Sequence, residues 1–378
     1  METPSAAPLR WFTTGDAMFA AMRSAIGVAT HSVDCETYIF ADDAVGRAMR
    51  AALVAAARRG ARVRVLVDAL GSFELPDGFW NELRAAGGTV AWFNPLSAGR
   101  PGIRDHRKLL VCDGRVAFLG GFNLAAHYAG DGVTSGWRDV GVAIEGELVA
   151  GLTASFEQML ALAALPHKRF PRLRRSVARR MWPAHHARLL LGAPGRGPHP
   201  IYRSLLADLR GAQDVAVMVP YFLPPWGLRR ALQRVARRGG RVRLLLPGPC
   251  DVPLAQLAAQ SYYARLLRAG IELYEYQPQV LHGKLFILGD ATYVGSANLD
   301  RRSLRWNYEL MVRWVEPARA AEARAIFAAA LSHARRIEPD EWRRSRSLWT
   351  RWRERWAHFL LARVDPWLSR WQWRTLPE

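Results

Sequence analysis

The chain repeats one pattern of apolar and polar positions. Met49, Leu53 and Ala56 recur at three- and four-residue spacing, which is typical of the buried face of a helix. A glycine then ends the helix, and a short β-branched and leucine run predicts a strand. Residues 57–67, ARRGARVRVLV, return at 236–246 as ARRGGRVRLLL, with eight of eleven positions identical at an offset of 179. The chain therefore predicts the same helix–turn–strand unit twice.

A second repeated segment strengthens this interpretation. Residues 106–123 read HRKLLVCDGRVAFLGGFN, and residues 282–298 read HGKLFILGDATYVGSAN. Each copy places His-x-Lys before an apolar run, a polar turn, a second apolar run and an Asn. We expect two homologous halves, over 9–162 and 199–332. Alternating helices and strands predict an α/β fold in which each half is a mixed β-sheet flanked by helices, packed face to face with the site between them.

Two further segments differ from the halves in composition. Residues 163–200 hold nine basic residues and no acidic one, so we expect a basic linker or surface arm over 163–198. Residues 341–378 contain seven of the 15 tryptophans, together with nine arginines and four acidic residues. We therefore expect a Trp/Arg-rich amphipathic tail over 333–378.

The overall charge indicates the kind of partner. Lys and Arg number 53 against 33 Asp and Glu, for a net charge of +20, which indicates nucleic acid or an anionic membrane surface. Three cysteines without CxxC spacing exclude a disulfide framework and a zinc ribbon. No secretory signal is visible, and no apolar stretch reaches the roughly 18–20 residues that span a bilayer. We expect a cytosolic or peripheral protein.

The repeated His-x-Lys pairs carry the chemistry. On a strand, side chains two residues apart share one face, so His106 and Lys108 point together, as do His282 and Lys284. These pairs use two of the only three lysines in the chain. Two cations with carboxamide donors form an anion site suited to a phosphoryl group, and two imidazoles can divide nucleophilic and acid–base work. Cys and carboxylate residues lack the spacing of metal ligands, so no metal or other cofactor is expected.

This pattern resembles the phospholipase D superfamily, whose signature is HxKxxxxD followed by a Gly/Ser-rich turn and Asn. The first copy matches in full, but in the second copy the place of the Asp is taken by Gly289, and Asp290 follows one residue later. Asp290 either fills the role from a shifted turn or the role is absent. The resemblance implies catalytic roles for His106, Lys108, Asp113, His282, Lys284 and Asp290, and phosphate-binding roles for Asn123, Ser296 and Asn298.

The resemblance also implies how the roles divide. The first-motif histidine of the family is usually the nucleophile, which would make His106 the phosphohistidine and His282 the general acid and base. The near-symmetry of the two copies leaves this assignment open. A downstream carboxylate typically orients each imidazole. Asp139, 33 residues after His106, and Glu309, 27 residues after His282, match those positions.

Several segments look like bacterial cardiolipin synthases in particular, over about residues 9–332. They include ETYIF, HRKLLVCDG, WRDV, PYFLP and LHGK with VGSANLDRRSL. The resemblance implies a metal-independent transfer of a phosphatidyl group to phosphatidylglycerol or a related alcohol. It also implies the short form without N-terminal transmembrane helices. We therefore expect peripheral association with anionic phospholipids, phosphatidylglycerol and cardiolipin, at the cytoplasmic face of the cell membrane.

The tail is the candidate for membrane contact. Trp342, Trp349, Trp352, Trp356 and Phe359 are spaced by 7, 3, 4 and 3 residues, which places them on one face of a helix with arginines among them. Tryptophan is typical of the lipid headgroup level, and arginine attracts anionic lipid. The alternative is a helix whose tryptophans pack against the protein's own core.

Other functions stay open beside the transferase. A nuclease of the same superfamily would use the same histidines, and the net charge suits a phosphate backbone. The cardiolipin-synthase segments, and the concentration of charge in the linker and the tail, make nucleic acid the less favoured partner. A hydrolase would use water as the acceptor and release phosphatidic acid. A non-enzymatic membrane-binding protein is disfavoured because both His-x-Lys pairs are intact.

Overall fold

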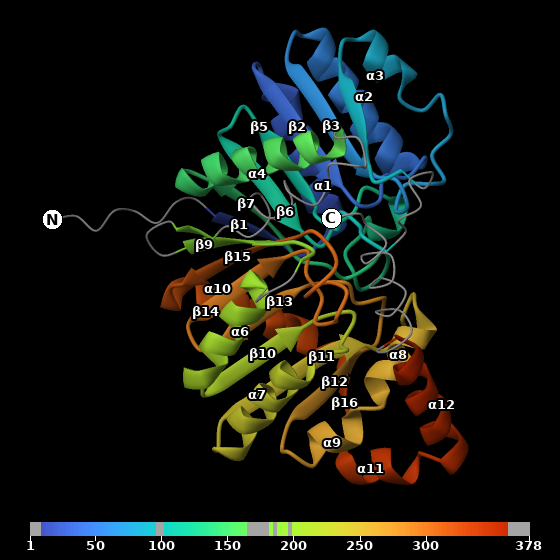
Figure 1. The fold of residues 1–378 in the computed structure, drawn as a ribbon, viewed down its shortest axis with the longest axis vertical. Coiled ribbons are helices and arrows are strands. Elements are labelled where there is room, and N and C mark those ends of the chain that lie inside the picture. The colour runs from blue at the N-terminus through green and yellow to red at the C-terminus, as the bar shows by residue number, and fades with distance from the viewer. Residues whose placement is uncertain (1–8, 96–101, 165–180, 184–186, 196–198, 362–378) are drawn as a thin grey trace, which may run out of the picture.

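The computed structural model describes residues 9–95, 102–164, 181–183, 187–195 and 199–361. Figure 1 shows two α/β halves whose sheets meet at the middle of the molecule. The first half consists of β1 (Leu9–Phe12), α1 (Gly15–Val28), β2 (Ser32–Thr37), α2 (Ala44–Arg58), β3 (Arg62–Asp68), α3 (Asn81–Ala85), β4 (Thr89–Phe93), β5 (Leu109–Cys112), β6 (Val116–Gly120), η2 (Ala126–Tyr128), β7 (Gly141–Glu145) and α4 (Glu147–Ala164).

The second half repeats this arrangement. It consists of β8 (Met181–Pro183), β9 (Ala187–Gly192), α6 (Pro200–Gly211), β10 (Asp214–Met218), α7 (Trp226–Arg237), β11 (Arg241–Pro247), α8 (Pro253–Gln260), α9 (Tyr263–Leu267), β12 (Glu272–Tyr276), β13 (Leu285–Leu288), β14 (Ala291–Gly295), β15 (Glu309–Val315) and α10 (Pro317–Leu331). It is followed by β16 (Ala334–Arg336), α11 (Pro339–Arg344) and α12 (Leu348–Phe359).

The two sheets have matching strand orders. The first runs β1-β7-β6-β5-β2-β3-β4, and the second runs β16-β12-β11-β10-β13-β14-β15-β9-β8. In each, three strands pair in parallel (β2, β3 and β4; β10, β11 and β12) and the rest pair antiparallel. The expected fold of two mixed sheets flanked by helices is confirmed.

The repeated segment forms the expected helix–turn–strand unit in both halves. The apolar positions of α2, Met49, Leu53 and Ala56, are buried against the first sheet. Asp43 begins α2 by accepting hydrogen bonds from the backbone N–H groups of the first turn, which is the role of an N-cap. Gly60, with a φ of 95°, turns the chain from α2 into β3.

The predicted linker over 163–198 is wrong for part of its length. Strand β9 lies in this range and pairs antiparallel with β15, as β1 pairs with β7 in the first half. The apolar run of Leu189, Leu190 and Leu191 is buried, and this burial outweighs the basic composition of the surrounding segment. Residues 165–180, 184–186 and 196–198 of the predicted linker lie outside the described residues.

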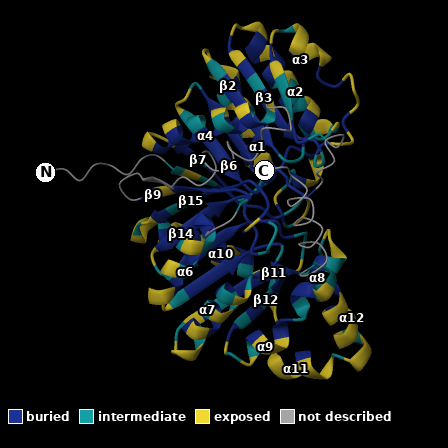
Figure 2. Ribbon diagram, in the orientation of Figure 1, coloured by how far each residue is buried: buried dark blue, intermediate teal, exposed yellow. Residues whose placement is uncertain are grey.

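The predicted tail also begins inside the fold. β16 joins the edge of the second sheet by pairing with β12, and Trp342 of α11 is 5% exposed and packs on the ring of Tyr263 at 4.7 Å. For Trp342 the core-packing alternative is therefore correct. The other aromatic side chains of the predicted stripe, on α12, are exposed (Figure 2). Residues 362–378 lie outside the described residues.

The halves share one hydrophobic core. A continuous cluster of buried side chains includes Leu119 and Val142 of the first sheet together with Val294 and Leu310 of the second. Figure 2 shows the strands of both sheets buried where they meet. Because burial of apolar surface contributes about 25 cal/mol per Å², a cluster of this size fixes the two sheets against each other.

Two backbone bridges cross this interface. The segment before β5 pairs with the segment before β15: the His106 N–H donates to the Tyr308 carbonyl at 3.0 Å, and the Tyr308 N–H donates to the Arg104 carbonyl at 2.9 Å. Reciprocally, the His282 N–H donates to the Arg138 carbonyl at 2.7 Å. Each histidine segment is therefore tied to the opposite half.

We predict that Gly295 is required for stability. Its φ is 156°, and a Cβ there would lie 2.1 Å from the Leu310 carbonyl oxygen. Gly295→Ala should lower the free energy of unfolding by about 1–3 kcal/mol in urea denaturation. Gly27→Ala, in α1 with nothing within 4 Å of the new Cβ, is the control and should be neutral or stabilising. Equal denaturation midpoints for the two variants would contradict the prediction.

Candidate active site

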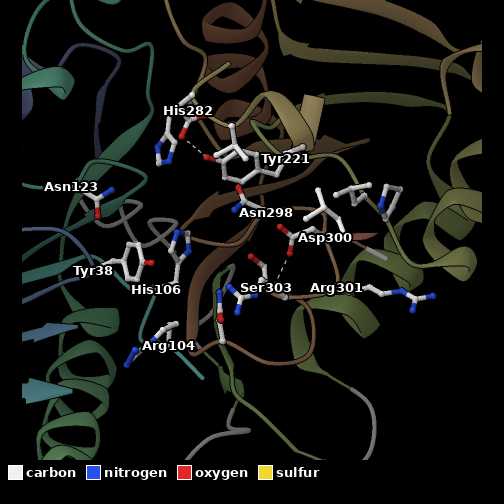
Figure 3. A pocket seen from close by; sticks show the side chains of 18 of the residues that line it. Tyr38, Arg104, His106, Asn123, Tyr221, His282, Asn298, Asp300, Arg301 and Ser303 are labelled. Atoms are coloured by element: carbon white, nitrogen blue, oxygen red, sulfur yellow. Dashed lines mark hydrogen bonds between the residues drawn. The ribbon is translucent and has the colours of Figure 1, made fainter. Parts of the chain in front are cut away.

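A cavity of about 580 Å³ opens at the junction of the two halves. His106 and Asn123 reach it from the first half, and His282 and Asn298 from the second (Figure 3). One wall is apolar and comes from the second half and from Leu361, which follows α12: Leu223, Pro224, Trp226, Val252, Ala255, Tyr262 and Leu361. The cavity therefore joins a polar, nearly symmetric centre to an apolar side.

The two His-x-Lys pairs occupy equivalent places, directly before β5 and β13. Lys108 Nζ donates to the His106 carbonyl, and Lys284 Nζ donates to the His282 carbonyl, each at 2.6 Å. All four side chains are buried. The structure thus brings together the two imidazoles and two ammonium groups that the repeat predicted.

Each imidazole is held by a carboxylate of the other half. His106 Nδ1 lies 3.1 Å from Glu309 Oε2, and His282 Nδ1 lies 2.6 Å from Asp139 Oδ2. The expectation that each histidine is oriented by the carboxylate downstream of it is wrong in this respect. The backbone bridges are the reason, since Glu309 and Asp139 directly follow Tyr308 and Arg138.

The carboxylates are themselves positioned by the Gly/Ser turns. Ser296 Oγ donates to Glu309 Oε2 at 2.5 Å and accepts from the Leu310 N–H at 3.0 Å. Its counterpart Gly121 leaves room for Asp139, because a Cβ there would lie 2.0 Å from Asp139 Oδ1. Ser296 therefore orients Glu309. In the first copy this position is glycine because a side chain there would collide with Asp139.

Burial holds the histidines neutral. It lowers the pKa of His282 to about 4, with Lys284 adding to the effect, and it lowers the pKa of His106, with Lys108 adding to the effect. Burial alone would raise the pKa of Glu309, but His106 and Ser296 lower it overall. A neutral imidazole that donates Nδ1–H to a carboxylate leaves the Nε2 lone pair available, which is the tautomer that a nucleophile needs.

The lysines also have depressed pKa values. Burial and the neighbouring Lys284 lower the pKa of Lys108 to about 7, and burial lowers that of Lys284 to about 8. Two buried ammonium groups repel each other unless an anion lies between them. The two lysines lie beside the histidines that line the cavity, so their charges would stabilise a phosphate group bound there.

The two motif asparagines, Asn123 and Asn298, differ in their hydrogen bonds. Asn123 Oδ1 accepts from the Ile39 N–H at 3.1 Å, and its Nδ2 donates to the Tyr128 hydroxyl at 2.6 Å. Tyr128 in turn lies 3.4 Å from His282 Nε2. Asn298 Oδ1 is buried and has no hydrogen-bond partner within the described ranges. Asn298 thus has a free acceptor at the cavity, whereas Asn123 is engaged in positioning Tyr128.

The motif aspartate lies outside the cavity. Asp113 is at the far end of β5, where its carboxylate accepts from the backbone N–H groups of residues 30–32. Burial opposes ionisation, but these donors lower the pKa of Asp113 to about 2. Its role in the structure is to close a turn, so the expected place for it in the catalytic cluster is not borne out by the geometry.

Asp290 does not replace the motif aspartate. Asp113 has a φ of 53° and Gly289 a φ of 63°. The N–H of each donates to the carbonyl of the first residue of the neighbouring strand, Ser32 of β2 and Asp214 of β10. Gly289 is therefore the counterpart of Asp113, and Asp290 is an exposed turn residue. The second copy adopts the turn with glycine, which takes this conformation without strain.

The motifs did not indicate several side chains that surround the histidines. Tyr128 and Trp137 pack on His282 with ring centroids at 5.1 and 5.5 Å, and Tyr38 packs on His106 at 5.2 Å. Tyr38 belongs to the ETYIF segment and Trp137 to WRDV, so the resemblance to cardiolipin synthases is the sequence signal that marks both residues. No group of three or more metal-ligating side chains occurs in the described part of the chain.

The sequence profile of the cardiolipin synthase, PLD-like domain matches residues 22–160 and 205–331, one match in each half. The chain belongs to this phospholipase D-like cardiolipin synthase family. Cardiolipin synthase B of Shigella flexneri is 36% identical over 318 residues, which cover 79% of this chain and 74% of that protein. A cardiolipin synthase of Geobacillus kaustophilus is 34% identical over 79% of this chain and 61% of its own length.

Solved structures share the fold of this cardiolipin synthase-type enzyme. The phosphatidylserine synthase of Haemophilus influenzae superposes with a TM-score of 0.75 over 96% of this chain and 94% of that one, at 13% identity. A polyphosphate kinase of Porphyromonas gingivalis gives a TM-score of 0.60 over 88% of this chain and 49% of its own, at 17% identity. Within the residues that the structure covers, no helix has the length and apolar character to cross a bilayer.

The pKa values predict how anion binding depends on pH. The lysines lose their charge as pH rises through about 7 to 8, so affinity for tungstate, a dianion across this range, should fall from pH 6.5 to pH 9. Titration calorimetry should show Lys284→Met weakening binding about 10–100-fold at pH 6.5 and flattening the pH dependence. Lys168→Met removes the remaining lysine of the chain and is the control. A pH-independent affinity would contradict the prediction.

Proposed function

We propose that the enzyme moves a phosphatidyl group from a phospholipid to a hydroxyl of phosphatidylglycerol, forming cardiolipin through a phosphohistidine. The observation that carries the proposal is the pair of buried imidazoles that line one cavity, each held by a carboxylate of the opposite half and each beside a buried lysine. This arrangement offers one nucleophile, one proton donor and a cationic site for the phosphodiester.

In the first step, the donor phosphate lies between Lys108 and Lys284. His106, the first-motif histidine and so the usual nucleophile of the family, attacks phosphorus through Nε2. The bond from phosphorus to the headgroup oxygen breaks, and His282 gives that oxygen a proton. A bound phosphate anion raises the pKa of both imidazoles, which favours the protonated His282 that this step needs. Asp139 stabilises this imidazolium through its hydrogen bond to Nδ1.

In the second step, the hydroxyl of the acceptor gives its proton to His282 and its oxygen attacks phosphorus. The bond from phosphorus to His106 breaks, and the histidine returns to its neutral form. The apolar wall of the cavity, with Leu223, Trp226 and Val252, favours a lipid alcohol over water. This wall supports the transferase over the hydrolase and the nuclease.

We predict that the purified protein converts phosphatidylglycerol vesicles into cardiolipin and free glycerol, with His106→Asn as the inactive control. Mass spectrometry of the lipids measures both products. Phosphatidic acid as the sole product would make water the acceptor and overturn the transferase. No lipid turnover, with cleavage of a DNA or RNA substrate, would favour the nuclease.

The crossed carboxylates allow the two steps to be separated. Asp139→Asn removes the partner of His282, so turnover should fall by about 10³–10⁴-fold. Because His282 must also deprotonate the acceptor, we expect the phosphatidyl-enzyme to accumulate when the donor headgroup is a good leaving group such as p-nitrophenol. Glu309→Gln should slow formation of the same species without accumulation. Intact-protein mass spectrometry after rapid quenching measures the amount of phosphatidyl-enzyme in each variant. Accumulation in Glu309→Gln and not in Asp139→Asn would exchange the roles of the histidines.

We further propose peripheral attachment to anionic phospholipids, at the cytoplasmic face of the cell membrane, through the aromatic ridge of α12. This ridge consists of Trp349, Trp352, Trp356 and Phe359, which are 64, 53, 49 and 56% exposed. At 100° per residue it lies opposite the buried Glu354 and Ala357, which face the protein. Arg351, Arg353 and Arg355 flank the ridge, as expected for a helix that lies at an anionic lipid surface.

The position of α12 supports this proposal. His358 and Leu361, at the end of the helix, line the cavity, and His358 contacts the Tyr262 hydroxyl at 2.5 Å. A bilayer against the ridge would therefore lie next to the cavity. A substrate lipid could then pass from the membrane to the histidines along the apolar wall.

We predict that replacing Trp349, Trp352 and Trp356 by Ser reduces partitioning onto phosphatidylglycerol vesicles at least about tenfold, because each tryptophan loses its burial at the headgroup level. Vesicle flotation measures the bound fraction. Val28→Ser, which removes a side chain that is 76% exposed on α1, is the control. Unchanged flotation of the triple variant would place the membrane contact elsewhere.

A further inference from the structure

The internal repeat allows the surroundings of the two histidines to be compared position by position. Asn123 to Tyr128 and Asn298 to Ser303 align without a gap, and the backbone confirms the alignment: Leu124 bridges to Phe40 as Leu299 bridges to Phe222. Tyr128 therefore corresponds to Ser303.

A second correspondence follows from the bridges between the halves. Arg138 and Tyr308 hold equivalent places, each bridged to the segment of the opposite histidine. The residues before them, Trp137 and Asn307, are therefore counterparts. The two rings that pack on His282, Tyr128 and Trp137, are replaced on the other side by two small polar residues.

This difference leaves a polar niche in the cavity wall, which we define as Arg104, Asn298, Ser303 and Asn307. Figure 3 shows Arg104, Asn298 and Ser303 among the side chains that line the cavity with His106. Asn307 Nδ2 lies 3.5 Å from Glu309 Oε1, the carboxylate group that orients His106. The niche is thus directly beside the reacting centre.

The niche contains unsatisfied polar atoms. Asn298 Oδ1, Ser303 Oγ, Asn307 Oδ1 and Arg104 Nη1 have no hydrogen-bond partner among the described residues, and the four residues are between 1 and 8% exposed. Buried polar atoms without partners are uncommon in folded proteins, because each costs about 1–3 kcal/mol. Several of them at one cavity wall indicate a ligand that supplies the missing hydrogen bonds.

We propose that the polar niche binds the hydroxyl groups of the lipid headgroup, so that the enzyme selects phospholipids with a polyol headgroup such as phosphoglycerol. Amide oxygens accept from hydroxyl groups, and a serine hydroxyl can donate or accept, so the niche complements a polyol. This inference rests on the proposed phosphatidyl transfer and adds to it the part of the site that recognises the headgroup.

The test compares two donor lipids with the same acyl chains in detergent micelles, phosphatidylglycerol and phosphatidylpropanol, which lacks both headgroup hydroxyls. Both are assayed with saturating butanol as the common acceptor, because phosphatidylpropanol offers no hydroxyl of its own. The wild type should release glycerol with a kcat/KM about 10–100-fold above that for propanol, since a site with buried polar groups rejects an analogue that cannot pair with them. Ser303→Ala should reduce this ratio about tenfold, and Ser303→Thr should restore most of it.

Ser24→Ala, an exposed serine of α1, is the matched control and should keep the wild-type ratio. A wild type that uses both lipids equally, or a Ser303→Ala variant with an unchanged ratio, would overturn the niche while leaving phosphatidyl transfer intact. Turnover of neither lipid by the wild type would overturn both proposals. If Ser303→Ala fails to fold, inhibition of the wild type by glycerophosphoglycerol against glycerophosphopropanol decides, because equal inhibition constants contradict the niche.

Discussion

The reciprocal bridging of the two halves is the constraint on which the site depends. Each histidine of the cavity lies on a segment whose backbone pairs with the opposite half, and the residue that follows the pairing partner is the carboxylate that orients that histidine. The shared hydrophobic core holds these segments in register. A change that loosens the interface would therefore reach both imidazoles at once, even from a distance, since catalysis is sensitive to displacements of about 1 Å.

Burial gives this site its electrostatic character. In water, two lysines and two histidines would be mostly charged or readily charged, but here burial lowers the pKa of all four groups. Burial therefore reduces the positive charge of the site, and an anion placed there would raise the pKa of the same groups. In the proposed mechanism, binding of the phosphodiester and protonation of His282 would be coupled, because the same negative charge stabilises both lysines and the imidazolium.

Features that depend on neighbouring residues could be predicted from the sequence, whereas contacts between the two halves could not. The helix–turn–strand units and the His-x-Lys pairs follow from side-chain periodicity, which is local, and they could be predicted. The crossed pairing of Asp139 and Glu309 depends on how two halves dock, which the spacing along the chain does not specify. Strand β9 was not predicted, because its short apolar run lies in a segment rich in arginine. The strand forms because this run is buried and pairs with β15.

The two copies of the repeat differ at several positions of the site, and these positions could not be predicted from the sequence. The sequence alone does not show whether Gly289 or Asp290 is the counterpart of Asp113. The turn geometry identifies Gly289, because Gly289 and Asp113 both have a positive φ. Tyr128 and Trp137 have no chemical likeness to Ser303 and Asn307, so the repeat in the sequence does not reveal that these residues correspond. Their correspondence becomes visible only when the backbone bridges supply the alignment.

The crossed pairing also has a consequence for the protein as a duplicated chain. A single half, folded by itself, would hold a histidine and a carboxylate that cannot meet, whereas two identical halves around a twofold axis would complete each other at two equal positions. In such a symmetric pair, any substitution beside one histidine would be copied beside the other. Joining the halves in one chain removes that constraint, so that one side can keep aromatic rings while the other becomes polar.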